Sequence, residues 1–481
     1  MSDMTRSQAD PRVRMSEVLD RQKAAFLRDG PPDLAARIDR LDRCVGLLRK
    51  YETQIVKALS DDFGHRSPDA SRLTDVAGAI GPFHFAKSHL KSWMKTQRRG
   101  VDFPLGLFGA KAEVQIQPKG VVGVISPWNF PINLTFIPLA GILSAGNRAM
   151  IKPSEFTPKT SDLMAEMFES AFRAEEIAVF TGGADVGAAF AGLAFDHLLF
   201  TGAGSIAKHV MRAAAENLVP VTLELGGKSP VIISRTADMP LAAKRIMMGK
   251  TLNAGQICLA PDYVLVPSER QGEFVEAAKS AVAAMYPTIK ENPDYTSMIN
   301  QRHYDRVMGY VEDAAAKGAE IVSLNPGNED FRQQEHRRIP PTLILNPSED
   351  MKVMQEEIFG PVMPVKTYVG VNEAVAYVNS KDRPLGLYYF GQDKAEETMV
   401  VSGTTSGGVT VNDVVFHVAQ EDLPFGGVGP SGIGSYHGRD GFFEFSHKKA
   451  VYTQVKPDLT AMMRPPFTDK MRAYVTKQIT G

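Results

Sequence analysis

The residue that points most directly to chemistry is Cys258, in the run NAGQICLAP that starts at Asn253. It is one of only two cysteines among 481 residues, and it lies between a glycine-containing turn and a proline. Packing alone would accept Ala or Val there, so the position favours a nucleophile, although a buried core cysteine explains this residue alone equally well. A nucleophilic thiol would need an oxyanion donor, a base and an acceptor for electrons.

Two expected strand ends offer places for a nucleotide. After Phe200, residues 201–207 read TGAGSIA, and this spacing matches a dinucleotide-binding turn in which an acid about 20 residues further on, here Glu224, binds ribose. The run IKPSE at 151–155 follows another strand end and could bind an anion or hydroxyl groups. Taken alone, a tight turn without a ligand explains the first pattern as well, and a charged surface turn explains the second.

Length and composition limit the class of protein. A chain of 481 residues exceeds one ordinary core, so we expect two or three domains. The formal net charge is −1 and no arginine-rich tract occurs, which argues against a nucleic-acid partner. Two cysteines cannot build a disulfide framework, and the first residues carry no apolar signal-peptide segment. The sequence therefore predicts a cytoplasmic globular protein.

One segment, from Lys119 to Arg148, has no charged residue between its ends and is long enough to cross a bilayer. Three prolines interrupt it, at 127, 131 and 138, and broken backbone in lipid leaves polar groups unpaired. We therefore expect a buried strand, a turn and a buried helix, and no membrane partner.

The rest of the chain predicts an α/β fold. Residues 15–95 are expected to be helical, with Cys44 beside an apolar stripe and hence in the core, and 101–119 to form a hairpin. Short apolar runs then alternate with helical stretches, which predicts two doubly wound parallel-sheet domains with a seam near Gly226 and Gly227. The expected strands start near 121, 148, 178, 197 and 219, then near 263, 320, 342, 362, 388 and 408.

Seven short motifs occur in one order along the chain. They are SPWNFP at 126–131, KPSE at 152–155, FTG at 200–202, ELGGK at 224–228, GQIC at 255–258, EEIFGP at 356–361 and PFGG at 424–427. From about residue 20 to residue 455 the sequence resembles the aldehyde dehydrogenase superfamily. The runs at 424–438 and 445–447 resemble its class 3 branch, and within it bacterial coniferyl aldehyde dehydrogenases.

The resemblance implies a covalent mechanism. Cys258 would attack an aldehyde to give a thiohemiacetal and then a thioester, with Asn129 and the Cys258 backbone N–H as oxyanion donors. In the family the glutamate of ELGGK activates the hydrolytic water, so Glu224 becomes the general base instead of a ribose ligand. A free thiol with a pKa near ~8.5 is a few per cent thiolate at neutral pH, which can suffice for attack, and a nearby base or the cationic nicotinamide could raise that fraction.

The resemblance also implies the NAD site. Lys152 and Glu155 would hold the adenosine ribose, Glu357 the nicotinamide ribose, and Phe359 would flank the nicotinamide ring. The other expected cofactor-binding residues are Trp128, Gly202, Ala203 and Leu225. The turn departs from the family pattern, which often has a hydroxyl residue at 203 and glycine at 207, whereas this chain has alanine at both positions. Glu155 should repel a 2′-phosphate, which favours NAD, although class 3 relatives often accept NADP too.

Phe130 and Ile257 are next to the oxyanion residue and the nucleophile, so we expect them to face the aldehyde channel. Apolar walls favour aromatic or medium-chain aldehydes, and no metal is expected. Tyr436 and His437 could line the cleft or only pack in a turn. Two alternatives remain open at this point: an enzyme that passes the acyl group to coenzyme A, against which Glu224 argues, and an inactive binding protein on the same scaffold.

The resemblance divides the chain into functional parts. Residues 1–100 and 120–225 would form the NAD-binding domain and 226–420 the catalytic domain. The segments 101–119 and 441–458 would form an oligomerisation element, which implies a homodimer.

Overall fold

The computed structural model describes residues 10–456 and 458–481, and it begins with helices, as the apolar spacing predicts. Cys44 is fully buried on the second helix, so it is a core residue as expected. The N-terminal elements are α1 (Pro11–Asp29), α2 (Leu34–Lys50), α3 (Glu52–Phe63), α4 (Pro68–Ser71), the π-helix η1 (Arg72–Ala77) and α5 (Gly78–Trp93).

The first sheet has the strand order β15-β7-β6-β3-β4-β5. Its strands are β3 (Val121–Ile125), β4 (Arg148–Lys152), β5 (Ile177–Val179), β6 (His197–Thr201), β7 (Val221–Glu224) and β15 (Gly432–Ile433). The helices between them are α6 (Asn133–Ser144), α7 (Pro158–Ala171), α8 (Ala184–Ala191) and α9 (Gly204–Ala215). Alternate strand residues pack against α2, α3, α5, α6 and α7 on one face and against α1, α8 and α9 on the other.

The second sheet has the order β10-β11-β12-β9-β8-β13-β14. Its strands are β8 (Pro230–Ile233), β9 (Tyr263–Pro267), β10 (Glu320–Ser323), β11 (Thr342–Leu345), β12 (Val362–Tyr368), β13 (Gly386–Phe390) and β14 (Gly408–Val411). Its longer helices are α10 (Met239–Thr251), α11 (Gln271–Met285), α12 (Gln301–Ala316), α14 (Val371–Asn379) and α15 (Lys394–Gly403). Short helices complete it, namely η2 (Leu252–Gly255), η3 (Ser268–Arg270) and α13 (Lys352–Gln355). Helices α10 and α11 cover one face and α14 and α15 the other.

The prediction of two parallel sheets needs one correction. Strand β15 runs antiparallel to β7, and β10 runs antiparallel to β11, so each sheet is parallel except for one edge strand. Such an antiparallel edge is common on parallel sheets, and it does not disturb the central strands. The sequence analysis also missed β8, a short central strand that begins with Pro230, where a proline is tolerated at a first position.

The parallel strands decide where a site can form. Residue Ile125 at the end of β3 is paired with Lys152 of β4 and with Phe200 of β6, and Thr201 is paired with Glu224. The carboxyl ends of these strands therefore meet at one edge, where open α/β sheets bind ligands. The charge-free segment forms β3, a turn and α6, as predicted, and no helix among residues 10–456 and 458–481 is long and apolar enough to cross a membrane.

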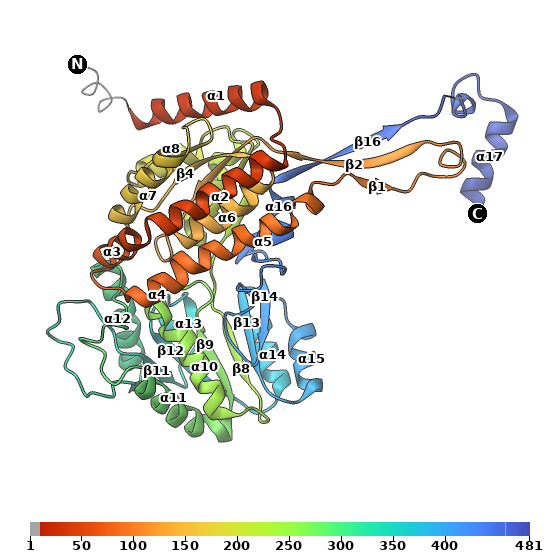
Figure 1. Cartoon of the computed structure of the whole chain (residues 1–481). Coiled ribbons are helices and arrows are strands. Elements are labelled where there is room, and N and C mark those ends of the chain that lie inside the picture. Colours follow the sequence, from red (N-terminus) through yellow and green to blue (C-terminus); the bar gives the residue numbers. More distant parts are fainter. Residues whose placement is uncertain (1–9, 457) are drawn as a thin grey trace, which may run out of the picture.

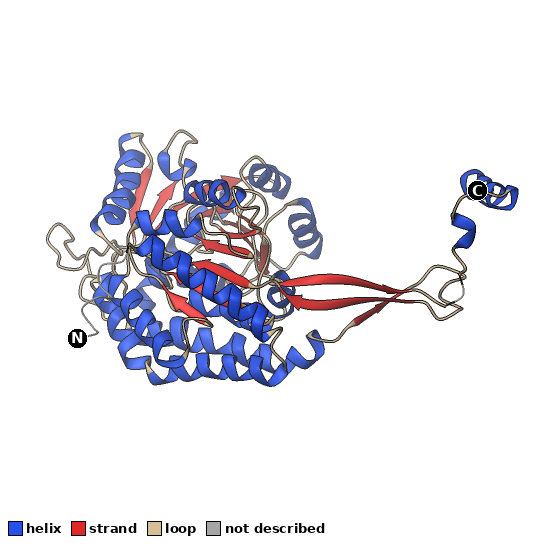
Figure 2. Ribbon diagram, turned by 90° about the horizontal axis from the view of Figure 1, so that it is seen from above, coloured by secondary structure: helices blue, strands red, loops and turns tan. Residues whose placement is uncertain are grey.

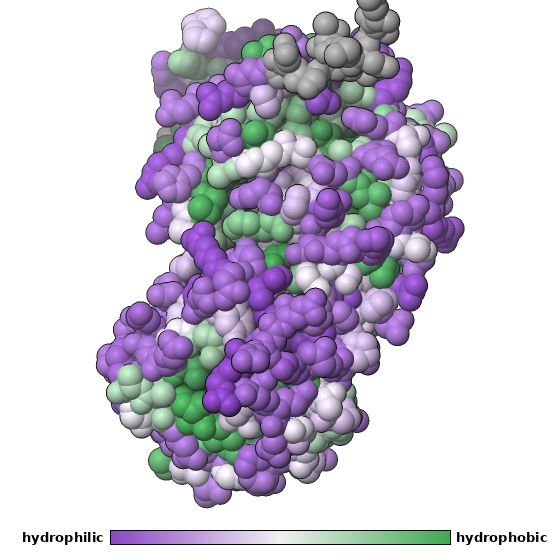
Figure 3. Space-filling view, turned by 90° about the vertical axis from the view of Figure 1, so that its left-hand side faces the viewer, coloured by the Kyte–Doolittle hydropathy of each residue, from purple (hydrophilic) through white to green (hydrophobic). Residues whose placement is uncertain are grey.

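A three-stranded antiparallel arm projects from the body (Figures 1 and 2). It consists of β1 (Gln97–Arg99), β2 (Lys111–Pro118) and β16 (Ser446–Thr453), so the predicted hairpin exists with strands just outside and inside its expected bounds. The chain reaches β16 through α16 (Gly438–Glu444) and continues through η4 (Ala461–Met463) to α17 (Asp469–Thr480) at the far end of the arm. Figure 3 shows a mostly hydrophilic face of the body, with hydrophobic side chains in separate groups.

Candidate active site

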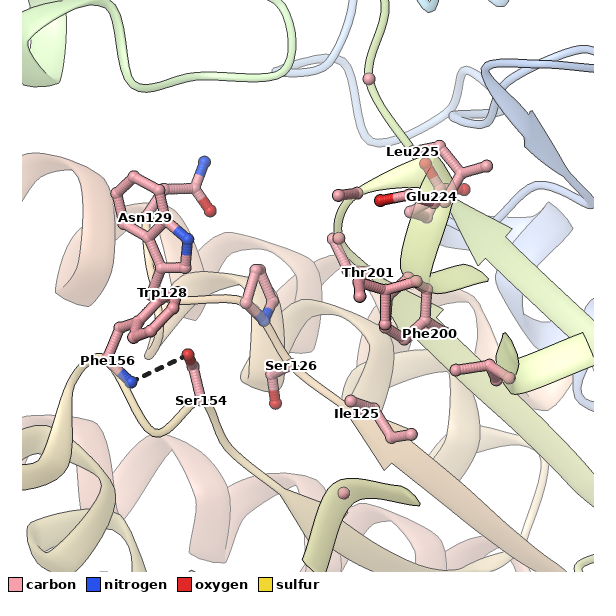
Figure 4. A pocket seen from close by; sticks show the side chains of 18 of the residues that line it. Ile125, Ser126, Trp128, Asn129, Ser154, Phe156, Phe200, Thr201, Glu224 and Leu225 are labelled. Atoms are coloured by element: carbon pink, nitrogen blue, oxygen red, sulfur yellow. Dashed lines mark hydrogen bonds between the residues drawn. The ribbon is translucent and has the colours of Figure 1, made fainter. Parts of the chain in front are cut away.

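A cavity of ≈ 1070 Å³ lies at the carboxyl ends of β3, β4, β6 and β7, and the second sheet's loops close it. Figure 4 shows Trp128 and Asn129 on one side of it and Glu224 with Leu225 on the other. The structure brings together eleven sequence-predicted residues in its lining: Trp128, Asn129, Lys152, Glu155, Gly202, Ala203, Glu224, Leu225, Cys258, Glu357 and Phe359. Phe130 and Ile257 do not line it; they are buried in the core against which Cys258 packs.

An unusual backbone turn presents Cys258. Asn253, Ala254 and Gly255 have successive φ values of 50°, 53° and 71°, a left-handed conformation that costs roughly 1–2 kcal/mol per non-glycine residue. At Gly255 a Cβ would overlap the carbonyl of Gly360, so only glycine fits. The strained turn is stable because buried amides hold it.

Gln256 supplies most of those hydrogen bonds. It is fully buried, and its Nε2 donates to the carbonyls of Asn253 (2.9 Å) and Ser297 (3.1 Å). Its Oε1 accepts from the Ile299 N–H at 3.0 Å. Because every polar atom of this side chain is used, the backbone that precedes Cys258 has little freedom.

Asn129 lies beside this turn. The residue is 3 % exposed, and its Nδ2 donates to the carbonyl of Gln256 at 3.1 Å. An amide has two N–H donors, so the second is left for an acceptor in the cavity. The Asn129 amide is therefore bonded to Gln256, two residues before the nucleophile Cys258. This position suits the stabilisation of an oxyanion.

The Cys258 thiol is partly exposed to the cavity, but its surroundings do not favour ionisation. Burial, together with the carboxyl groups of Glu357 and Glu224, raises the pKa of Cys258 to about 12. The few per cent of thiolate that a free thiol would have is therefore not reached in this structure, since desolvation and nearby acids both disfavour a thiolate. In this conformation the thiol is protonated at neutral pH.

Glu224 ends strand β7 and lies opposite Gly432 of β15, where a Cβ would overlap the Leu223 carbonyl, so glycine allows the two strands to approach this closely. It is 2 % exposed, and neither carboxyl oxygen has a hydrogen-bond partner within the described chain. Burial, and then the charge of Glu444, raise its pKa well above the ordinary value. Enzymes that use an acid for proton transfer commonly raise its pKa in this way.

Glu357 is the third acid at the cavity. Burial raises its pKa to about 7, and its Oε1 lacks a partner among the described residues. The loop that carries it is pinned by Lys228, whose Nζ pairs with Asp262 and donates to the carbonyl of Glu356 at 2.8 Å. Asp262 in turn accepts from the Ile358 N–H at 2.9 Å. The lysine of ELGGK therefore links that motif to EEIFGP.

The opposite end of the cavity carries a lysine and an uncapped helix. Lys152 is 2 % exposed, donates to the Pro153 carbonyl at 2.7 Å and lies 3.6 Å from Glu155. Burial lowers the pKa of Lys152, while Glu155 opposes that shift. Helix α9 starts after Ala203 without a side-chain cap, so its first N–H groups are available to an anion at the cavity wall.

Sequence reasoning missed one wall, which comes from α12. His303, Arg306 and Tyr310 line the cavity, and the His303 ring lies 5.0 Å from that of Trp128. Arg306 donates to the Ile358 carbonyl at 2.8 Å, and Tyr310 to a Glu356 carboxylate oxygen at 2.7 Å. These three side chains are spaced i, i+3 and i+7, the one-face spacing of a helix, which could have indicated them.

The two residues left open, Tyr436 and His437, are buried, with the His437 ring 5.1 Å from that of Phe425. His437 has a φ of 131°, and both its ring nitrogens are buried without a described partner. Burial lowers its pKa to about 3, so it is neutral. Among residues 10–456 and 458–481, no three His, Cys, Asp or Glu side chains are placed to hold a metal ion.

Comparison with known proteins settles the family. A profile described as the aldehyde dehydrogenase family matches residues 8–451. The chain belongs to the aldehyde dehydrogenase family. This confirms the resemblance and the activity: the enzyme is an oxidoreductase that oxidises an aldehyde to the carboxylic acid with NAD or NADP.

Individual relatives place this aldehyde dehydrogenase more closely. A probable coniferyl aldehyde dehydrogenase of Caulobacter vibrioides is 66% identical, over 97% of this chain and 96% of that protein. The coniferyl aldehyde dehydrogenase of a Pseudomonas species is 51% identical, over 96% of each. The substrate-bound AldH structure from Staphylococcus aureus superposes with a TM-score of 0.89 at 36% identity, covering 96% of this chain and 99% of that one, which confirms the α/β fold.

Proposed function

We propose that this aldehyde dehydrogenase oxidises coniferaldehyde and related aromatic aldehydes to their acids, with Cys258 as nucleophile. One observation carries the proposal: Cys258, Asn129 and Glu224 line one cavity at the edge where the strands of the first sheet end. The similarity to coniferyl aldehyde dehydrogenases of Caulobacter vibrioides and Pseudomonas supports the substrate class.

In the first half-reaction, the Cys258 sulfur attacks the aldehyde carbon and the thiol proton leaves to solvent. The carbonyl oxygen becomes negatively charged, and the free N–H of the Asn129 amide, together with the Cys258 backbone N–H, stabilises it. One such donor is typically worth about 3 kcal/mol in the transition state. The nicotinamide dinucleotide, when bound, supplies the hydride acceptor. Loss of a hydride from the former aldehyde carbon to this acceptor converts the thiohemiacetal on Cys258 to a thioester.

In the second half-reaction, Glu224 takes a proton from a water molecule, whose oxygen attacks the thioester carbon. The carbon–sulfur bond breaks and the carboxylic acid is released, and the leaving Cys258 sulfur takes up the proton from Glu224, which regenerates the thiol and the carboxylate. The buried, unpartnered carboxyl of Glu224 supports this role because it has no competing hydrogen bond in the described chain. Only its ionised form can accept the proton, so this step is favoured as pH rises.

The residues around the cavity fit a dinucleotide. The unpartnered Oε1 of Glu357 is a buried acceptor that a ribose hydroxyl would satisfy. Glu155, next to Lys152, would bind the other ribose and repel a 2′-phosphate, which favours NAD over NADP. The uncapped start of α9, with Gly202 and Ala203, would receive the pyrophosphate. Trp128, Leu225 and Phe359 line the same cavity and supply apolar contacts.

The aldehyde would reach Cys258 along the apolar side that contains Phe130 and Ile257. Both are buried in the core cluster that also holds Phe425, and Cys258 packs against that cluster. We infer that the flat aromatic part of the aldehyde substrate packs against this apolar side of Cys258. We propose the sheets as separate NAD-binding (1–100 and 120–225) and catalytic (226–420) domains.

We further propose a cytoplasmic homodimer. The two free thiols, Cys44 and Cys258, suit a reducing compartment. The arm, with the oligomerisation segments 101–119 and 441–458, exposes large apolar side chains: Phe103 is 85 % exposed and Leu107 is 76 % exposed. Such side chains, on an element that projects from the body, suit burial against a second copy of the chain.

The test is a panel of aldehydes assayed for NADH and NADPH formation. Coniferaldehyde should give the highest kcat/KM, followed by benzaldehyde and then hexanal, with NAD preferred over NADP. A preference for hexanal over both aromatic aldehydes would contradict the substrate proposal. Absence of substrate bound to Cys258, in mass spectra of enzyme quenched during turnover, would contradict the mechanism.

A further inference from the structure

A buried ion pair lies next to the loop that carries Asn129. The Arg66 side chain is 1 % exposed and that of Asp75 is 0 % exposed, and they are joined by a hydrogen bond of 2.6 Å. Taking two charges out of water costs several kcal/mol per ion, and a buried pair is weak evidence for stability by itself. The contacts of this ion pair show that it also holds the neighbouring loop.

Arg66 holds the backbone of Asn129. Its Nη1 donates to the Asn129 carbonyl at 3.0 Å, and Asn253 Nδ2 donates to the same oxygen at 3.1 Å. Asn129 lies between β3 and α6, outside both elements, so side chains must satisfy this buried carbonyl. The Asn129 carbonyl therefore accepts two hydrogen bonds, one from Arg66 of the N-terminal segment and one from Asn253 of the turn that presents Cys258.

Two aromatic rings keep Arg66 in place. Its guanidinium lies 4.8 Å from the ring centroid of Phe130 and 5.0 Å from that of Phe63. The Phe63 ring is in turn 6.3 Å from that of Trp128. Arg66 thus contacts the oxyanion loop at Asn129 and Phe130 and, through Phe63, supports Trp128.

Asp75 ties the same arginine to the far end of the loop. Its Oδ2 accepts from Arg66, and its Oδ1 accepts from the N–H of Asn133, the first residue of α6, at 3.3 Å. Asp75 lies on the π-helix η1, a geometry that is rare and is frequently found at functional sites. Arg66 and Asp75 therefore fix the loop at Asn129 and again at Asn133.

We propose that Arg66, held by Asp75, is a positioning residue for the oxyanion hole, which sets the Asn129 amide at the reacting oxygen. This inference rests on the proposed role of Asn129. Without Arg66, Asn129 keeps only the contacts from the Cys258 turn, and its backbone carbonyl loses one of its two donors, so the loop that carries the amide is held less firmly. A misplacement of about 1 Å in a catalytic group can cost about 100-fold in rate.

The experiment compares four variants with the native enzyme: Asn129→Ala, Arg66→Met, Arg66→Met with Asp75→Asn, and Arg66→Met with Asn129→Ala. The variant that combines Arg66→Met with Asp75→Asn removes both charges of the buried pair, because a lone buried Asp75 would destabilise the fold. Arg37→Met is the matched control. Arg37 is also a buried arginine, 4 % exposed, that donates to a backbone carbonyl, Ser144 at 2.8 Å, and it does not contact the Asn129 loop.

Loss of Arg66, alone or with Asp75, should lower kcat and the rate of the NADH burst about 10- to 100-fold. The KM for NAD and the rate of Cys258 alkylation by iodoacetamide, in which no oxyanion develops, should change less than about twofold. Arg66→Lys, which keeps one donor, should recover part of the loss. Adding Arg66→Met to Asn129→Ala should cost little more, because both remove the same interaction. Arg37→Met should lower the melting temperature without changing kcat.

Two results would overturn the inference. One is native kcat in the folded Arg66→Met, Asp75→Asn variant. The other is a loss from Arg66→Met that is equally large in the Asn129→Ala background, because Arg66 would then act elsewhere. If Asn129→Ala itself kept native kcat, the proposed oxyanion role would fail first, and the inference would fail with it.

Discussion

The carboxylate of Glu357 lies directly against the backbone of Gly226, and a Cβ on that glycine would overlap both carboxylate oxygens. Gly226 follows β7 of the first sheet, whereas Glu357 precedes β12 of the second, so this contact joins the two sheets at the cavity. The glycine after Glu224 and Leu225 thus leaves the space that the Glu357 carboxylate occupies.

Gly226→Ala should displace Glu357 and weaken NAD binding, because the added methyl group occupies the place of the carboxylate. We expect the dissociation constant for NAD, measured by quenching of tryptophan fluorescence, to rise about 10-fold or more, the equivalent of about 1.4 kcal/mol. Gly272→Ala is the control, since nothing lies within 4 Å of its added carbon. Unchanged NAD binding in Gly226→Ala would refute the assignment of Glu357 to the nicotinamide ribose.

Cys258→Ala should abolish aldehyde oxidation and leave NAD binding intact, because the variant lacks the sulfur that attacks the aldehyde and keeps the cofactor wall. The measurements are NADH formation and the NAD dissociation constant. Cys44→Ala is the matched control: Cys44 is fully buried in the core, so its loss should lower the melting temperature only. Residual turnover above about one thousandth of the native rate in Cys258→Ala would point to another nucleophile.

The sequence predicted most strands and the residues that line the cavity because those signals are local. Apolar runs mark β3, β4 and β6, and the motifs that carry Asn129, Glu224 and Cys258 are each a few residues long. Contacts between distant residues gave no such signal. Arg66 and Asn129 are 63 positions apart, and nothing in the residues around Arg66 indicates that its guanidinium reaches the Asn129 carbonyl.

The chemical state of the site was predicted less well for the same reason. The raised pKa of Cys258 depends on burial and on Glu357 and Glu224, which lie on separate segments. The tertiary fold decides that β10 and β15 pair antiparallel to their neighbours. The residues of these two strands alone do not indicate whether the pairing is parallel or antiparallel.

Glu224→Gln should separate the two half-reactions. Thioester formation needs Cys258 and Asn129 but not Glu224, so a burst of about one NADH per site is expected. Turnover should then stall, with a steady rate lowered about 100-fold or more, because no base activates the water. Rapid mixing with detection of NADH measures both phases. Steady turnover at the native rate would show that another group serves as the base.

The arm predicts an oligomer that can be broken by charge. Replacing Phe103 and Leu107 by Asp places two charges on side chains that are 85 % and 76 % exposed in the single chain. If a second copy covers them, the substituted chain should elute as a monomer, with a molar mass by light scattering near 52.5 kDa instead of twice that value. A native chain that is already monomeric would contradict the dimer.

Glu444 should control the pH dependence of the hydrolytic step. Its charge is the second cause, after burial, of the raised pKa of Glu224. An acid with a raised pKa stays protonated to higher pH, and only the carboxylate accepts a proton from water, so kcat should rise with pH through this pKa when hydrolysis limits turnover. Glu444→Gln removes the neighbouring negative charge and keeps an acceptor for Thr222, which donates to Glu444 at 2.5 Å.

The acidic limb of the kcat profile should therefore move to lower pH in Glu444→Gln. The same limb should stay in place in the control Glu276→Gln, where the glutamate is exposed on α11. A profile that Glu444→Gln leaves unmoved would mean that the limb does not report Glu224.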